Sequence, residues 1–198
     1  MGIGFVVLAA YLLGSVPFAV VVSRLLGLQD PRSYGSGNPG ATNVLRSGSR
    51  KAAALTLLFD AAKGVVAVWV AGHWGIMVAA CAGLAVFLGH VYSVFLRFKG
   101  GKGVATALGV LLALDWRVAL CVLTVWLLVA LITRYSSLAA ILAALCAPVL
   151  SWLWMQHLWI TVCVTVMSVI LIWRHRGNIR KLLDRQEAKI MTKKRSDA

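Results

Sequence analysis

A polar segment near the start of the chain concentrates residues that can bind an anion. It reads Tyr34-Gly-Ser-Gly-Asn-Pro-Gly-Ala-Thr-Asn43, and an arginine, Arg46, follows three residues later. Glycines permit positive φ angles, so successive N–H groups can converge on one anion, and a guanidinium offers two parallel donors to a phosphate. The segment predicts a phosphate-binding loop, with an ordinary polar turn as the alternative. Its candidate ligands are Ser36, Gly37, Asn38, Gly40, Ala41, Thr42, Asn43 and Arg46.

A second glycine-rich segment, Lys99-Gly-Gly-Lys-Gly103, directly precedes an apolar run that is expected to be helical. The N–H groups at a helix start, the helix dipole and two ammonium groups would all favour an anion there. The segment is not a Walker A loop, in which the lysine is followed by serine or threonine. Alone, it fits a plain hairpin as well as a phosphate site. Its candidate ligands are Lys99, Gly100, Gly101, Lys102, Gly103 and Thr106.

A third group of polar residues follows the last apolar run, which ends Trp173-Arg-His-Arg-Gly-Asn178. His175 and Asn178 are spaced i, i+3, so on a helix they share one face and can point inward. Their basic neighbours, such as Arg176, fit lipid headgroups better.

Three ionisable residues lie inside apolar runs. Asp60 and Lys63 are spaced i, i+3, and such charges are costly in a membrane unless they are paired or face a polar cavity. A structural ion pair and a role in the site are both compatible with this spacing. A lone histidine such as His90, which follows Gly89, is more often a hydrogen-bonded structural residue than a catalyst, and we also count it among the candidate ligands of the phosphate loops.

Several common kinds of site are missing from the sequence. The histidines and cysteines show no metal-ligand spacing, and we expect neither a metal nor a cofactor. There is no His-x4-Asp pair, the general-base arrangement of many glycerolipid acyltransferases, and no Gly-x-Ser-x-Gly elbow. The chemistry indicated is anion binding rather than covalent or metal catalysis.

The elements that position these loops are membrane-spanning helices. The chain of 198 residues is 61% apolar with a mean hydropathy of +0.86, and residues 1–23 and 64–96 carry no Asp, Glu, Lys or Arg. About 20 apolar residues cross a bilayer as a helix. We therefore predict an all-α polytopic membrane protein that forms one domain over residues 1–198. The expected seven spans are 3–27, 52–71, 75–96, 104–115, 117–133, 137–155 and 158–173. The fourth is short, and either the glycine-rich stretch completes it or it is partly re-entrant.

The basic residues indicate the orientation of these spans. Of the 20 Lys and Arg, 17 fall in alternate loops and in the C-terminal tail, which holds nine between Arg174 and Arg195, whereas the other loops hold only Arg117. Positive charge gathers on the cytoplasmic side, so we expect the N-terminus outside and the C-terminus in the cytoplasm. This placement favours contact with anionic membrane lipid and excludes nucleic acid as a partner. It does not indicate an oligomeric state.

These segments together strongly resemble the bacterial acyl-phosphate:glycerol-3-phosphate acyltransferases, the PlsY family. The resemblance rests on segments that follow in the family's order along nearly the whole chain. They are Gly35-Ser-Gly-Asn-Pro-Gly-Ala-Thr-Asn43 with Arg46, Gly89-His90, Phe98-Lys-Gly-Gly-Lys-Gly-Val-Ala-Thr106, Tyr135-Ser-Ser-Leu138 and Arg174-His-Arg-Gly-Asn178. Two positions depart from the pattern. Ser93 stands where a proline is usual and Gly177 where a larger residue is common, and neither change removes a donor.

The resemblance implies transfer of an acyl group from acyl phosphate to the sn-1 hydroxyl of glycerol 3-phosphate in the bacterial inner membrane. The products would be lysophosphatidic acid and inorganic phosphate. Carried over by position, the residues that would hold glycerol 3-phosphate are Ser36, Arg46, Lys102, Ser137, His175 and Asn178. The backbone of residues 37–43 and 100–103 would cradle the acyl phosphate, with no cofactor. Two other classes of protein compete with this interpretation. They are a transporter for a phosphorylated solute and a lipid-binding structural protein.

Overall fold

The chain forms helices joined by short turns and two longer loops, as seen in a computed structural model that describes residues 2–190. No β-strand occurs in this range. The helices are α1 (Ile3–Ser15), α2 (Phe18–Leu25), α3 (Ala41–Leu45), α4 (Arg50–Gly72), α5 (Ile76–Val91), α6 (Val104–Leu114), α7 (Trp116–Thr133), α8 (Ser136–Met155), α9 (Leu158–Arg174) and α10 (Arg176–Leu183), with a 3-10 turn at Val94–Leu96. The prediction of an all-α protein is confirmed for this part of the chain.

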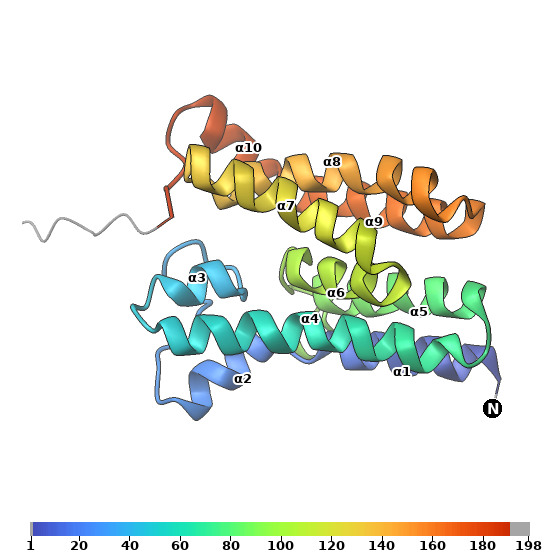
Figure 1. The fold of residues 1–198 in the computed structure, drawn as a ribbon. Coiled ribbons are helices and arrows are strands. Elements are labelled where there is room, and N and C mark those ends of the chain that lie inside the picture. The colour runs from blue at the N-terminus through green and yellow to red at the C-terminus, as the bar shows by residue number, and fades with distance from the viewer. Residues whose placement is uncertain (1, 191–198) are drawn as a thin grey trace, which may run out of the picture.

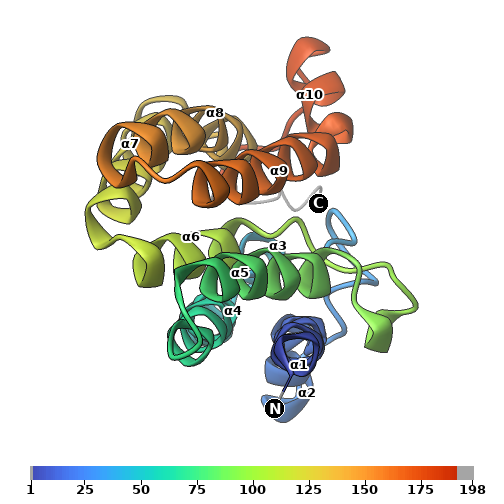
Figure 2. The same ribbon diagram turned by 90° about the vertical axis from the view of Figure 1, so that its right-hand side faces the viewer.

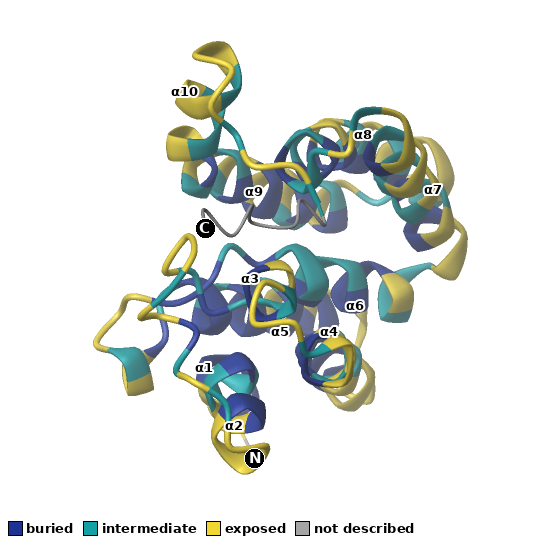
Figure 3. Cartoon of the chain, turned by 90° about the vertical axis from the view of Figure 1, so that its left-hand side faces the viewer, coloured by how far each residue is buried: buried dark blue, intermediate teal, exposed yellow. Residues whose placement is uncertain are grey.

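The long helices run side by side in two layers. Helices α1, α2, α4, α5 and α6 form one layer, and α7, α8 and α9 form the other, with α10 beyond it (Figures 1 and 2). Helix α5 packs against α1, α4 and α9, so it joins the layers. The fully buried side chains of Phe87 and Val86 lie in the largest apolar core. Exposed residues lie on the outward faces of the helices (Figure 3). Many of them are large and apolar, such as Ile132 at 81% exposure, as expected of helices that face lipid.

Four helices are individually long and apolar enough to cross a membrane, namely α4, α5 with its 3-10 extension, α7 and α8. Two bent pairs, α1 with α2 and α9 with α10, also qualify if each counts as one span. Helix α6 has 11 residues, so it is about 16 Å long and shorter than the hydrocarbon core. The seven-span count and the orientation of the termini stay predictions.

The first predicted span, residues 3–27, is wrong as one continuous helix. The chain bends by 45° between α1 and α2. Pro17 causes the break, because it has no N–H to donate and it forces Val16 into an extended conformation with ψ of 117°. A second bend, of 53°, separates α9 from α10 at His175. We expected His175 and Asn178 to share a face of one helix. Instead, His175 lies at the bend between the two helices and Asn178 lies in α10.

Glycine allows α1 and α5 to approach each other closely. A Cβ built on Gly89 of α5 would overlap the carbonyl oxygen of Tyr11, and a Cβ on Gly14 of α1 would overlap the carbonyl of Val86. Small residues that let helix backbones meet are a common means of packing in membranes. This contact fixes α5, and through α5 the loop that follows it.

We expect Gly89→Ala to destabilise the protein by about 2 kcal/mol, because backbone atoms of α1 cannot yield to the added methyl group as a flexible side chain would. Thermal unfolding in detergent measures the change. Gly72→Ala is the matched control, since a Cβ there meets nothing within 4 Å. Equal melting temperatures for the two variants would contradict the close approach.

Candidate active site

The polar segments singled out from the sequence meet at one end of the bundle. Three contacts between distant parts of the chain bring them together. The ammonium of Lys102 donates to Asn178 Oδ1 at 2.5 Å, and the hydroxyls of Thr42 and Ser136 are 3.3 Å apart. The guanidinium of Arg174 donates to the Gly100 carbonyl at 3.0 Å. One site is thus formed by four segments. They are the first loop (residues 34–46), the second glycine-rich loop (residues 99–103), the start of α8 and the bend between α9 and α10.

Asn43 organises the first loop. Its side-chain amide donates to the carbonyls of Pro31 and Tyr34 at 2.6 and 3.2 Å, and its Oδ1 accepts the N–H of Ser36 at 3.0 Å. The residue is only 2% exposed. Gly35 allows this arrangement, because it has a φ of 59° and a Cβ there would overlap Asn43 Oδ1. Asn43 was predicted as a direct ligand, but its amide is used inside the loop.

The N–H groups of the first loop divide into two sets. Those of Ser36, Gly37, Gly40 and Asn43 donate to acceptors within the loop. Those of Asn38, Ala41 and Thr42 have no hydrogen-bond partner among residues 2–190. Arg46 and Ser36 are exposed beside them, and the Arg46 guanidinium lies 3.4 Å from Asn43 Oδ1. The second set, with these two side chains, is available to an anion.

The second glycine-rich loop is held against the end of α5. The N–H of Gly100 donates to the Val91 carbonyl at 3.1 Å, and that of Gly101 donates to the His90 carbonyl at 3.0 Å. These two groups are occupied, contrary to the predicted cradle of residues 100–103. Within the described residues, the N–H groups of Lys102 and Gly103 have no partner, so the free donors lie at the start of α6.

Lys102 lies where positive charges gather. Burial lowers its pKa to about 8, the nearby Glu187 carboxylate opposes this shift, and the cations of Arg46, Arg174 and Lys181 lower the pKa further. At pH 7 the ammonium form still dominates. A site with several cations close together is suited to a dianionic phosphate.

Sequence reasoning missed Glu187. One oxygen of its carboxylate, Oε1, accepts hydrogen bonds from Ser137 Oγ and from Asn178 Nδ2, each at 2.7 Å. The predicted ligands Ser137 and Asn178 are therefore brought together on a single anionic oxygen. A lone glutamate in a basic tail gives no periodic or motif signal that could have identified it.

His175 lies at the bend between α9 and α10 and is 3% exposed. Its Nδ1 lies 2.8 Å from the Leu171 carbonyl, so the ring proton is on Nδ1 and Nε2 is left as an acceptor. Such a nitrogen can accept a hydrogen bond from a hydroxyl group.

Three other predicted ligands lie away from these donors. Lys99 is exposed in a surface cavity of about 520 Å³, which Arg32 and Arg97 also line. Thr106 is fully buried where α6 packs against α4, and its hydroxyl has no partner in the described structure. His90, also counted among the candidate ligands, lies beneath the second loop, where its Nδ1 is 3.0 Å from the Lys63 ammonium. The Asp60–Lys63 ion pair is confirmed at 2.6 Å.

Ser93, one of the two departures from the family pattern, makes a compensating contact. Its buried hydroxyl donates to the Ser15 carbonyl at 2.5 Å, which ties the end of α5 to the end of α1. The other departure, Gly177, lies in α10, and a Cβ there meets nothing within 4 Å.

We expect kcat/KM for a substrate whose phosphate binds to Lys102 to fall about tenfold per pH unit once the pH rises above about 8. The lowered pKa of Lys102 means that its ammonium is lost through that range, since a lysine is charged only below its pKa. A pH–rate profile measures this. In Lys102→Arg the decline should disappear, because a guanidinium does not titrate there. The same decline in both proteins would assign it to another group.

Comparison with known proteins identifies the family. The model of the family described as glycerol-3-phosphate acyltransferase matches residues 4–185. The chain belongs to the glycerol-3-phosphate acyltransferase family. A relative of that name from Paraburkholderia phytofirmans is 57% identical over 200 residues, covering 98% of this chain and 93% of the relative. Another from Bordetella pertussis is 56% identical over 199 residues, covering 95% and 92%.

Solved structures of the glycerol-3-phosphate acyltransferase PlsY, described as an integral membrane protein, share the fold. The glycerol 3-phosphate form aligns with a TM-score of 0.91 and 41% identity over 96% of both chains. The lysophosphatidic acid form gives 0.89 and 40% over 96% of this chain and 95% of the other. The chain is thus an integral membrane member of this acyltransferase family, as the resemblance implied.

Proposed function

We propose that this acyltransferase uses an acyl phosphate as its donor and acylates the sn-1 hydroxyl of glycerol 3-phosphate. The products are lysophosphatidic acid and inorganic phosphate. The observation that carries the proposal is the convergence of Lys102, Asn178 and Ser137 with two loops that present free N–H groups. Both substrates carry a phosphate, and the site offers two groups of anion donors at one end of the bundle.

Glycerol 3-phosphate binds through side chains. Ser137 and Asn178 already share a carboxylate oxygen of Glu187, which shows that these donors suit an anionic oxygen. The solved structures titled as glycerol 3-phosphate and lysophosphatidic acid forms support the same substrate and product class. The proposed ligands are Ser36, Arg46, Lys102, Ser137, His175 and Asn178.

The acyl phosphate binds through backbone N–H groups of the two loops, chiefly those of Asn38, Ala41, Thr42, Lys102 and Gly103. Its acyl chain stays among the membrane lipids, because the apolar surfaces of the helices continue to this end of the bundle. We place the site on the cytoplasmic side of a bacterial inner membrane, on the strength of the basic loops that surround it.

The reaction needs no covalent enzyme intermediate, because an acyl phosphate is already activated. The glycerol hydroxyl oxygen attacks the acyl carbonyl carbon, the bond from that carbon to the phosphate oxygen breaks, and inorganic phosphate leaves. The hydroxyl proton passes to a substrate phosphate oxygen. Orientation of the two substrates can supply part of the roughly 7–11 kcal/mol available from proximity. The Lys102 ammonium stabilises the departing phosphate.

The test uses the purified protein in lipid with palmitoyl phosphate and glycerol 3-phosphate, and it follows both phosphate release and lysophosphatidic acid. Palmitoyl-CoA runs in parallel. Phosphate release that requires both substrates, with palmitoyl-CoA inert, is the expected result. Transfer from palmitoyl-CoA alone would overturn the proposed donor. No transfer by a folded sample would favour transport of a phosphorylated solute.

We expect His175→Ala to retain measurable turnover and to bind glycerol 3-phosphate more weakly, because the histidine is a ligand and the substrate phosphate takes the proton. Steady-state kinetics and binding of glycerol 3-phosphate separate the two effects. A variant that binds both substrates normally but has lost all turnover would instead make His175 the general base.

A further inference from the structure

Asp60, Lys63 and His90 form a buried polar cluster beneath the second glycine-rich loop. The Lys63 ammonium has three hydrogens and faces three acceptors, namely Asp60 Oδ1 at 2.6 Å, His90 Nδ1 at 3.0 Å and the Val16 carbonyl at 3.1 Å. Because an ammonium only donates, Nδ1 of His90 accepts and the ring proton lies on Nε2. The cluster therefore matches each ammonium hydrogen with an acceptor and fixes the orientation of the imidazole.

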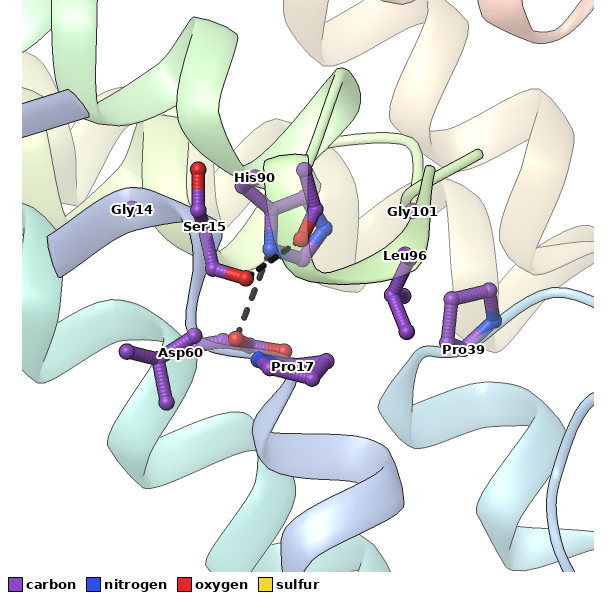
Figure 4. A pocket seen from close by; sticks show the side chains of 10 residues that line it. Gly14, Ser15, Pro17, Pro39, Asp60, His90, Leu96 and Gly101 are labelled. Carbon is purple, nitrogen blue, oxygen red and sulfur yellow. Dashed lines mark hydrogen bonds and ion pairs between the residues drawn. The ribbon is translucent and has the colours of Figure 1, made fainter. Parts of the chain in front are cut away.

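His90 transmits this orientation to the loop. Its carbonyl accepts the N–H of Gly101, and a Cβ on Gly101 would overlap the imidazole at Nε2, so the ring packs directly on the loop backbone. Figure 4 shows Asp60 and His90 side by side, with Asp60 Oδ1 3.4 Å from His90 Nδ1, at the edge of a small cavity that Gly101 and Leu96 also line. The cavity volume is about 10 Å³, close to the space of one water. There is little room for the ring or the loop to move independently.

The cluster also holds the break between α1 and α2. The Lys63 ammonium reaches the Val16 carbonyl next to Pro17, and it lies 5.5 Å from the centre of the Phe18 ring. Three parts of the chain thus meet at one side chain: the bend in the first helix pair, the middle of α4 and the end of α5.

Helix packing alone does not explain these charges. Asp60 and Lys63 are 2% and 3% exposed, and burying an ion pair costs desolvation that well-packed apolar residues of similar volume avoid. Charged residues inside a membrane segment that lie next to a polar site usually serve that site. The nearest polar site here is the loop that ends at Gly103.

We propose that Asp60 and Lys63 are positioning residues for acyl transfer. They fix the His90 ring, and the ring fixes the loop of residues 100–103 against the phosphate of the acyl donor, while neither residue touches a substrate. This inference rests on the proposed function of that loop.

The first test replaces the pair by apolar residues in the double variant Asp60→Leu/Lys63→Met. We expect it to keep the wild-type melting temperature within a few degrees, because the space stays filled. Its kcat/KM for palmitoyl phosphate should fall about 30-fold, since small misplacements of a binding loop have effects of that order. The KM for glycerol 3-phosphate should change less than about threefold. Wild-type kcat/KM for palmitoyl phosphate at a wild-type melting temperature would overturn the proposal.

The matched control is Asp115→Asn/Arg117→Gln. This removes another ion pair of 2.6 Å, which lies at the turn between α6 and α7. Both the melting temperature and the kinetics should stay as in the wild type.

If the apolar double variant fails to fold, the single variants His90→Gln and His90→Leu test the positioning role instead. Glutamine can accept from Lys63 and direct its amide at the loop, so it should retain most activity, whereas leucine should not. Equal activity of the two would overturn the proposal.

Hydrogen exchange provides a readout that does not depend on the reaction. The N–H groups of Gly100 and Gly101 should exchange faster in the apolar double variant than in the wild type, with no change in exchange within α8. Suppose that exchange is faster in the double variant but that the wild type is inactive with palmitoyl phosphate. This result would uphold the positioning of the loop and reject the proposed acyl donor. Unchanged exchange would overturn the positioning role whatever the wild type does.

Discussion

Arg46→Ala and Lys102→Ala proteins should each insert into the membrane normally and lose acyl transfer by at least about 1,000-fold. Lys102 is a partly buried cation that donates a hydrogen bond to Asn178. Arg46 lies close enough to lower the pKa of Lys102. Removal of Lys102 takes a cation from a largely buried position, where a lost charge pair matters most, and removal of Arg46 takes away the bidentate donor beside the free N–H groups of the first loop. Initial rates with palmitoyl phosphate and glycerol 3-phosphate measure the loss.

Lys51→Ala is the matched control for these two variants. Lys51 is an exposed cation in the first turn of α4, at the same end of the bundle, and within the described structure its side chain makes no hydrogen bond or ion pair. Its removal should leave the rate within about twofold, because exposed charges contribute little. Robust activity of either Arg46→Ala or Lys102→Ala would contradict the site. Equal losses in all three proteins would indicate a general effect of surface charge.

Gly103→Ala should lower kcat/KM for the acyl donor by at least about 100-fold. Gly103 precedes the first residue of α6 and has a φ of 88°, a conformation that is strained for any residue with a side chain. A Cβ there would also overlap the fully buried ring of Phe87. The backbone must therefore shift, and the free N–H groups of Lys102 and Gly103 shift with it.

Two further variants show whether the loss comes from this shift. Phe87→Leu removes part of the obstructing ring, so the double variant Phe87→Leu/Gly103→Ala should recover part of the activity lost by Gly103→Ala. Gly177→Ala, at a position with open space and no positive φ, should be active. A fully active Gly103→Ala enzyme would show that this end of the loop does not touch the donor.

The sequence located the loops of the site but not their internal bonds. Glycine and polar density distinguished both loops, and alternation of basic residues placed them at the same end of the bundle. Asn43 was predicted as a ligand, whereas its side chain braces the loop. An asparagine suits either role, and only the path of the backbone shows the bracing contacts. The bend at Pro17 was readable, since proline inside a helical run removes a hydrogen bond.

Other features depend on contacts between distant segments, which no local pattern encodes. Glu187 reaches Ser137, 50 residues earlier in the chain, only because the chain bends by 53° after α9 and turns again after α10, where Arg185 has a φ of 57°. Lys63 was recognised as a costly charge, and its pairing with Asp60 was one of two expected outcomes. Its third acceptor, the Val16 carbonyl, exists only because α1 is broken there.

The short length of α6 sets the second glycine-rich loop back from the end of the bundle. Helices α6 and α7 share the turn at Asp115, and α7 with its 18 residues is about 27 Å long, against about 16 Å for α6. Because both helices extend from this turn, α6 ends about 10 Å short of α7 along the bundle, and Figure 1 shows α6 set back from that end. In a bilayer, the second glycine-rich loop would then lie below the ends of the longer helices. The fatty donor proposed above would then react without leaving its leaflet, and the water-soluble glycerol 3-phosphate would enter from the aqueous side to meet it.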